Sequence, residues 1–286
     1  MRLCSRWTPA VLCTILLTNI NEDRLVTMNR AFDSSETWYD SIAQDYQEAR
    51  HGYPEQLIED MIRLTRIQMG GRILEIGCGT GQASMPLARR GYQLLCIDRS
   101  HAMISIARSN FSAYQNIEFC CARFEDYAIV EQSFDVVLSA TAFHWIDEAC
   151  AYEKAALSLR DGGHIALIWT LWPSLEANPF EEAVSELFRT IAPDLLYRIS
   201  RPCQQPRGDI KEREIYRSGL FGNVVNRRYT WCADYDSVAY TRLLKTYYND
   251  TRLENLLTAI RNLIDVDFGG VVAQQYESVL YIARKI

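Results

Sequence analysis

The segment LEIGCGTG (residues 74–81) carries the residues whose types and spacing suit ligand chemistry. Three glycines at alternate positions follow a short apolar run and precede a helical pattern, which predicts a strand, a tight turn and a helix. Glycines at such a turn let the backbone approach a ligand closely. The N–H groups at the start of the next helix are free to bind it. We therefore expect a nucleotide-like ligand here, the alternative being that the glycines only form a tight turn.

Two carboxylates lie beside this turn. Glu75 stands two residues before Gly77 in a buried strand, where an unpaired carboxylate is costly. Asp98 ends the next apolar run, 17 residues after Gly81, where an acid can accept hydrogen bonds from both ribose hydroxyls. A nicotinamide site requires G-x-G-x-x-G/A, but the sixth position is Gln82. The pattern favours a ligand with ammonium and sulfonium groups over a dinucleotide.

The elements that must position these residues alternate between short apolar runs and helical patterns. Near-continuous apolar strands that alternate with helices predict a parallel sheet covered on both faces. The third helix should end at the turn 161–163. We expect strands at 72–77, 93–98, 117–122, 134–139, 164–170, 223–231 and 278–284, and helices at 82–90, 100–110, 146–159, 236–249 and 251–264.

Three motifs carry a resemblance to a known superfamily. ILEIGCGTG (73–81), CIDRS (96–100) and FDVVLSATAFHW (134–145) resemble motifs of class I S-adenosylmethionine-dependent methyltransferases. The Tyr and Arg pattern of residues 39–54, AFHW and YESVLYIARK (276–285) resemble the trans-aconitate methyltransferase-like (type 11) branch. The resemblance implies a doubly wound, Rossmann-like α/β fold. Its seven-stranded, mostly parallel sheet has the order 3-2-1-4-5-7-6 with the last strand antiparallel, a helical N-terminal lid and a helical insertion after the fifth strand.

The resemblance also implies the residues that hold the cofactor S-adenosyl-L-methionine. By this resemblance, Glu75 and the glycine turn contact the methionine moiety, and Asp98 contacts the ribose. Residues at the ends of the second and third strands contact the adenine. From the N-terminal lid, Tyr46 and Arg50 share one helical face, and an Arg grips a carboxylate with two parallel bonds. The alternative for Arg50 is a solvated surface position. The cofactor-binding set is Glu75, Gly77, Cys78, Gly79, Gly81, Asp98, Arg99, Met103, Ala122, Arg123, Phe124, Ser139, Tyr46 and Arg50.

The methyl acceptor should lie where ligand-facing side chains gather, at the carboxyl ends of the strands. His144 follows the fourth strand and is the candidate general base; the alternative is a histidine that only bonds within its loop. Five aromatic residues are candidates for the lining of the acceptor pocket; the alternative is that they only pack within the protein. They are Tyr39, Tyr53, Phe143, Trp145 and Trp169.

Residues 1–33 read as an extension, either disordered or before the true start, whose apolar run is too short to cross a membrane. We expect one methyltransferase domain over 34–286. It comprises a helical lid (34–69), a cofactor-binding core (70–170), a helical insertion (171–218) and C-terminal strands and helices (219–286). A protein beginning at Met28 should keep its fold and activity.

Composition narrows the partners. The net charge of −6 argues against nucleic acid, and nine cysteines without zinc spacing argue against a metal and for a reduced, cytoplasmic compartment. We expect a methyltransferase acting on a small-molecule carboxylate or hydroxyl, without membrane attachment, as monomer or homodimer. The alternatives are a nicotinamide-dependent oxidoreductase on a similar fold and a non-catalytic S-adenosylmethionine-binding protein.

Overall fold

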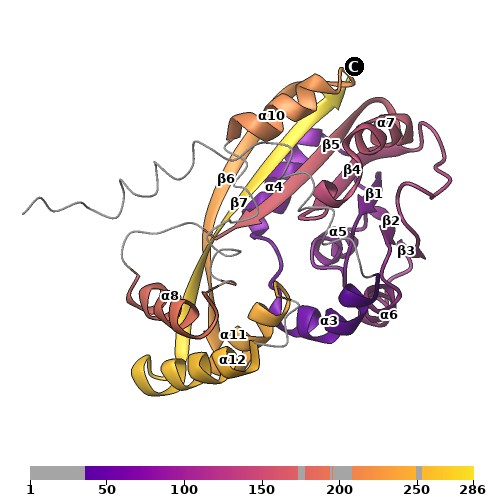
Figure 1. Ribbon diagram of the computed structural model, residues 1–286. Coiled ribbons are helices and arrows are strands. Elements are labelled where there is room, and N and C mark those ends of the chain that lie inside the picture. Colours follow the sequence, from indigo (N-terminus) through magenta and orange to yellow (C-terminus); the bar gives the residue numbers. More distant parts are fainter. Residues whose placement is uncertain (1–35, 173–177, 194, 196–207, 249–252) are drawn as a thin grey trace, which may run out of the picture. The chain divides into compact units, whose positions relative to one another are not determined.

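The computed structural model describes residues 36–172, 178–193, 195, 208–248 and 253–286. The expected extension 1–33 lies outside the described residues, as does part of the insertion. Residues Trp38–Ile286 form one compact unit, built around a seven-stranded sheet (Figure 1). Its strands are β1 (Arg72–Ile76), β2 (Gln93–Asp98), β3 (Ile117–Cys121), β4 (Phe134–Ala140), β5 (Leu159–Leu171), β6 (Phe221–Asp236) and β7 (Val271–Lys285).

The strand order is β3-β2-β1-β4-β5-β7-β6, which confirms the expected topology. Strands β1 to β5 are parallel, and β7 runs antiparallel to both β5 and β6. Because the four parallel pairings place the carboxyl ends of β1 to β5 at the same edge of the sheet, the turns that follow β1, β2 and β4 meet there.

Helices cover both faces of the sheet. On one face α4, α5 and α6 contribute to one apolar core; on the other, α7 and α10 contribute to a second. Ser100 caps α6 by accepting a hydrogen bond from the Met103 N–H, as its sequence position indicates. The helices of these two layers are α4 (Glu55–Thr65), α5 (Ser84–Arg89), α6 (His101–Asn110), α7 (Glu148–Ser158) and α10 (Gly208–Arg217).

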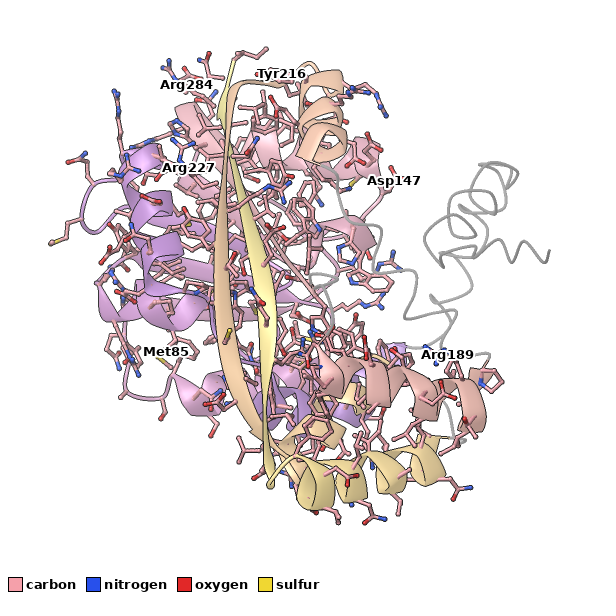
Figure 2. The ribbon with its side chains drawn as sticks, turned by 90° about the vertical axis from the view of Figure 1, so that its left-hand side faces the viewer. Met85, Asp147, Arg189, Tyr216, Arg227 and Arg284 are labelled. Atoms are coloured by element: carbon pink, nitrogen blue, oxygen red, sulfur yellow. The ribbon has the colours of Figure 1, made fainter. Side chains whose placement is uncertain are left out.

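The last two strands are much longer than their apolar patterns indicate. They pair from Phe221 with Lys285 to Asp236 with Val271. Figure 2 shows them running from the end marked by Arg284 past the helix that carries Arg189. Beyond β5 their side chains pack into a third apolar core with further helices. These are α8 (Pro179–Ile191), α11 (Ser237–Lys245), α12 (Leu253–Asn262) and the π-helical turn η2 (Leu263–Asp267).

Two sequence expectations are wrong in detail. The helix before β5 ends at Ser158, and residues 159–163 belong to β5 rather than to a turn. Gly162, with φ +74°, lets the strand bulge where its register with β4 shifts. The second difference concerns the expected helical lid, of which only α3 (Glu36–Ala49) lies at the carboxyl edge of the sheet. There Asp40 accepts hydrogen bonds from the start of α6. The helix α4 is not part of a lid, because it buries Leu57 and Met61 in the core.

Candidate functional site

The three glycines of the turn after β1 have positive φ angles and different surroundings. A Cβ on Gly77 would lie 2.3 Å from the Ala142 Cβ, and one on Gly81 would lie 2.3 Å from the Phe111 ring. These two glycines are therefore required for packing. At Gly79 the nearest atom to a Cβ is Cε1 of Tyr46, at 3.6 Å. Gly79 is the position at which the turn leaves room for a ligand.

Asp98 connects the end of β2 to this turn. Its carboxylate accepts hydrogen bonds from the backbone N–H groups of Gly79 and Ser100, both at 2.9 Å. Burial raises the pKa of the carboxyl above its ordinary value, and the two backbone bonds oppose that shift. Each oxygen keeps a second acceptor site, so the carboxylate can still bind a ligand hydroxyl.

Glu75 is a buried carboxyl group on β1, with 1% of its surface exposed. Its Oε2 accepts hydrogen bonds from Ser84 Oγ at 2.5 Å and Cys96 Sγ at 3.8 Å. Burial raises the pKa of Glu75 to about 7; the hydrogen bonds from Ser84 and Cys96 oppose this shift, but no cationic side chain among the described residues does. A positively charged ligand group would stabilise the ionised form.

One cavity joins Glu75 and Gly77 to the C-terminal strands, whereas Gly79, Gly81 and Asp98 are not part of its lining. It has a volume of about 610 Å³, its open mouth included, and extends from Glu75, Gly77 and Cys78 to the β6–β7 extension. Aromatic rings dominate the rest of the lining, from Tyr46 beside Gly79 to the residues of β6 and β7. Those six side chains are Tyr46, Tyr53, Trp231, Tyr235, Tyr247 and Tyr276.

Arg50 is a half-buried cation in the lining of this cavity. Its Nε donates to Thr246 Oγ1 at 2.9 Å and its Nη1 to Tyr247 OH at 2.6 Å, and the guanidinium carbon lies 3.8 Å from the Tyr247 ring centroid. In the described part of the chain no carboxylate pairs with Arg50. Arg50 is thus not a fully solvated surface residue, and a half-buried cation without a carboxylate partner favours an anionic ligand.

Thr141 directly follows β4 and lines the same cavity. Its φ is +56°, a region that β-branched residues rarely occupy. The conformation is held by a hydrogen bond from its N–H to Ile168 O and places its hydroxyl 3.3 Å from Tyr53 OH. Backbone strain of this kind concentrates at ligand sites.

The residues expected at the adenine lie around the ends of β2 and β3. The Ala122 N–H donates to Asp98 O, and Arg123 forms ion pairs with Glu125 and Asp126. Met103 packs beneath α3, and Phe124 is buried in the core. The Arg99 guanidinium carbon lies 5.6 Å from the Tyr39 ring centroid.

The expected acceptor residues do not all meet at the cavity. Tyr53 lines it, whereas Phe143 and Trp169 are packed in the core of the α7 face. Tyr39 and Trp145 contact each other, with ring centroids 6.2 Å apart. Ser139 is buried on β4 and donates to Ile76 O.

His144 also does not line the cavity. It lies in the short 3₁₀ turn η1 (Phe143–Trp145), where its Nδ1 accepts the indole N–H of Trp169 at 3.4 Å. An indole nitrogen only donates, so Nδ1 is unprotonated and the proton of the neutral ring is on Nε2. Burial, and secondly Lys211, lower the pKa of His144 to about 4. Although the residue as a whole is exposed, this lowered pKa keeps the ring neutral at pH 7.

Sequence reasoning did not identify several residues of the cavity. His51 stands in the stretch that supplied Arg50 and Tyr53 and was detectable there. The residues on β6 and β7 had no such signal, because only long-range pairing brings them to the carboxyl edge. The missed lining residues with polar or aromatic side chains are His51, Gln82, Thr141, Thr170, Trp231, Tyr235, Tyr247 and Tyr276.

The described residues hold no cluster of three or more His, Cys, Asp or Glu suited to a metal ion. Among the same residues, no helix is both long enough and apolar enough to cross a bilayer.

Comparison with known proteins gives consistent matches. Residues 73–163 match the family described as methyltransferase domain. An uncharacterised methyltransferase of Mycobacterium bovis is 29% identical over 131 residues, covering 46% of this chain and 51% of that protein. The ubiquinone biosynthesis O-methyltransferase of Parvibaculum lavamentivorans is 33% identical over 111 residues, which cover 38% of this chain and 44% of that protein. The chain thus spans about half the length of the curated relatives it matches.

Among solved structures, phosphoethanolamine N-methyltransferase 2 of Haemonchus contortus has a similar fold. The TM-score is 0.51 at 15% identity, over 88% of this chain and 57% of that one. At this identity the likeness concerns the fold alone.

Proposed function

We propose that this chain, whose methyltransferase domain belongs to the class I S-adenosylmethionine-dependent superfamily, transfers the methyl group of S-adenosylmethionine to a small-molecule acceptor. The observation that carries the proposal is the single cavity that runs from Glu75 and the glycine turn to an aromatic wall. Methyl transfer requires both reactants in one enclosed space, aligned and shielded from water.

The residues of the turn fit the methionine end of this cofactor. Gly79 leaves room for close approach, and the Glu75 carboxyl lacks a cationic side-chain partner that a ligand ammonium group would supply. Arg50 offers a cation for a carboxylate, first that of the cofactor and second that of an acidic acceptor. Asp98 is proposed for the ribose. The rest of the proposed cofactor set is Cys78, Gly77, Gly81, Arg99, Met103, Ala122, Arg123, Phe124, Ser139 and Tyr46.

The chain's own residues orient the reactants rather than form covalent bonds. The cofactor supplies an electrophilic methyl group on sulfur, which an acceptor electron pair attacks in line. Arg50, with its donors fixed by Thr246 and Tyr247, holds an anionic group in register. The rings of Tyr46, Tyr53 and Tyr247 exclude water. We propose an oxygen acceptor, carboxylate or hydroxyl; the O-methyltransferase among the relatives supports this choice.

The wider context is also a proposal. The compact unit of residues 38–286 supports one domain over 34–286, and placement in the trans-aconitate-type branch rests on the motif resemblance. Six described cysteines are free thiols, Cys78, Cys96, Cys120, Cys121, Cys150 and Cys232. Free thiols support a reduced, cytoplasmic compartment. A monomer or homodimer remains our expectation.

Calorimetry and a label-transfer assay test the proposal together. The protein should bind S-adenosylhomocysteine with micromolar affinity, about −8 kcal/mol, and should not bind NADH. With methyl-labelled S-adenosylmethionine and a metabolite extract, label should pass to a small molecule. Tight NADH binding without S-adenosylhomocysteine binding would overturn the proposal in favour of an oxidoreductase. Cofactor binding without any label transfer would indicate a non-catalytic binding protein.

A further inference from the structure

His51 lies in the connection between α3 and α4, directly after Arg50. Of the four histidines in the chain, all of them described, His51 alone lines the cavity. It shares that lining with Gly77 and Cys78 of the cofactor turn and with Tyr235 and Trp231 of β6. The imidazole is therefore within the space where cofactor and acceptor must meet.

Aromatic rings fix the His51 ring by edge contacts. Its centroid lies 4.9 Å from that of Tyr235 and 6.4 Å from that of Trp231, at interplanar angles of 77° and 80°. The polar atoms of these neighbours are engaged elsewhere. Tyr235 OH bonds to Tyr276 OH at 2.8 Å, and Trp231 Nε1 donates to Ser278 Oγ at 2.9 Å.

Neither ring nitrogen of His51 has a hydrogen-bond partner in the described part of the chain. The ring nitrogens are thus available to a ligand. His144 differs on both points, because it does not line the cavity and its Nδ1 lone pair accepts from Trp169.

Partial burial favours the neutral form of His51. Burial lowers the pKa of His51 below its ordinary value of 6.5. The facing groups of the cavity are the Arg50 guanidinium, the Glu75 carboxyl and the phenols of Tyr235, Tyr276 and Tyr247. Burial raises the pKa of both Tyr235 and Tyr276, so these phenols stay neutral.

We propose that His51 contacts the methyl acceptor and takes the proton of an acceptor hydroxyl during transfer; this inference rests on the proposed function. The acceptor O–H bond breaks and its proton moves to a ring nitrogen of His51. The O–CH₃ bond forms from an oxygen electron pair, and the S–CH₃ bond breaks with its pair left on sulfur. The imidazolium then returns the proton to water through its exposed edge.

The first test compares two probe acceptors of similar shape, phenol and benzoate, with labelled S-adenosylmethionine. Phenol needs a base, whereas ionised benzoate does not. For His51→Gln we expect a loss of roughly 10²- to 10⁴-fold in kcat toward phenol and a much smaller loss toward benzoate. The wild-type rate toward phenol should rise with pH through the His51 pKa, below 6.5; the His51→Gln rate should not.

Two further variants make the test specific. His164→Gln is the matched control, because His164 lies on β5 just after the bulge, opposite Val136 of β4, and does not line the cavity. It should keep both activities. The inference would be overturned if His144→Gln, and not His51→Gln, lowered kcat toward phenol. It would also be overturned if His51→Gln lowered kcat equally toward phenol and benzoate.

A second measurement requires no turnover. Imidazole ¹H–¹⁵N spectra of the S-adenosylhomocysteine complex, assigned by single His→Gln variants, should show the His51 signals shift when phenol is added while those of His164 do not. Unmoved His51 signals with a bound phenol would overturn the inference even if neither probe is methylated. A protein that binds no S-adenosylhomocysteine by calorimetry would instead overturn the proposed function.

Discussion

The carboxylate of Asp98 accepts a hydrogen bond from the Gly79 N–H at 2.9 Å. The residue proposed for the ribose therefore also holds the one glycine of the turn that leaves room for a ligand. If Asp98 binds the ribose as proposed, loss of its carboxylate should weaken cofactor binding in two ways, by removing acceptors for ribose hydroxyls and by releasing the turn.

Asp98→Ala should weaken S-adenosylhomocysteine binding by about 1.5–3 kcal/mol for each charge-assisted bond lost. Calorimetry measures this directly. Asp135→Asn is the matched control, because Asp135 is also a buried acid that accepts a backbone N–H, that of Arg72, at the opposite end of the sheet. It should change the free energy of unfolding but not the affinity. Unchanged affinity in Asp98→Ala would remove Asp98 from the site.

The glycines of the turn should separate folding from binding. Gly81→Ala places a Cβ 2.3 Å from the Phe111 ring at φ +100° and should lower the free energy of unfolding by about 1–3 kcal/mol. Gly79→Ala meets no such clash and should cost about 1 kcal/mol for its left-handed backbone, yet weaken cofactor binding at least tenfold. Urea unfolding and calorimetry on both variants test the distinction, which fails if the two lose affinity and stability in parallel.

The sheet core was predictable because its strands are buried on both faces. Runs such as β4, buried along nearly its whole length, are apolar almost throughout, and such runs read directly as strands. The glycine turn, Glu75 and Asp98 were found for the same reason, since each is tied to the end of such a strand.

The far wall of the cavity was not predictable from local pattern. Trp231 and Tyr276 are paired across β6 and β7 and stacked with centroids 4.5 Å apart, although they are distant in sequence. Side-chain direction was equally hidden: Thr170 lines the cavity while its neighbour Trp169 points into the opposite core. Successive strand residues alternate between faces, and the register that decides the face depends on long-range pairing.

Arg50 should contribute to cofactor binding through its charge and its geometry. Arg50→Ala should weaken S-adenosylhomocysteine binding by about 1.5–3 kcal/mol, and Arg50→Lys should restore only part of it because the planar fork is lost. Arg242→Ala is the control. Arg242 also joins α3 to α11, through Glu48 and Asp45, but does not line the cavity. Normal cofactor binding by Arg50→Ala, with altered KM for an acceptor, would assign Arg50 to the acceptor instead.

Glu75 should make the stability of the free protein depend on pH. Its pKa in the folded state, about 7, exceeds the ordinary value of 4.5. Between these values the unfolded chain has released a proton that the folded chain retains, so stability falls as pH rises. Relative to Glu75→Gln, the wild type should lose about 3 kcal/mol of unfolding free energy between pH 4.5 and above 7. Urea titrations of both proteins test this, and parallel pH profiles would contradict it.

Cofactor binding should reverse that protonation. If the ammonium group of S-adenosylhomocysteine lies near Glu75, its positive charge favours the carboxylate and lowers the Glu75 pKa. Binding at pH 6.5, below the free-protein pKa of about 7, should therefore release a proton, and affinity should increase from pH 5 to 7. Calorimetry in buffers of different ionisation enthalpy counts the released proton. Glu75→Gln should bind more weakly and release none through this group. Equal proton release by both proteins would show that Glu75 does not sense the cofactor, and would leave its carboxyl as a structural partner of Ser84 and Cys96.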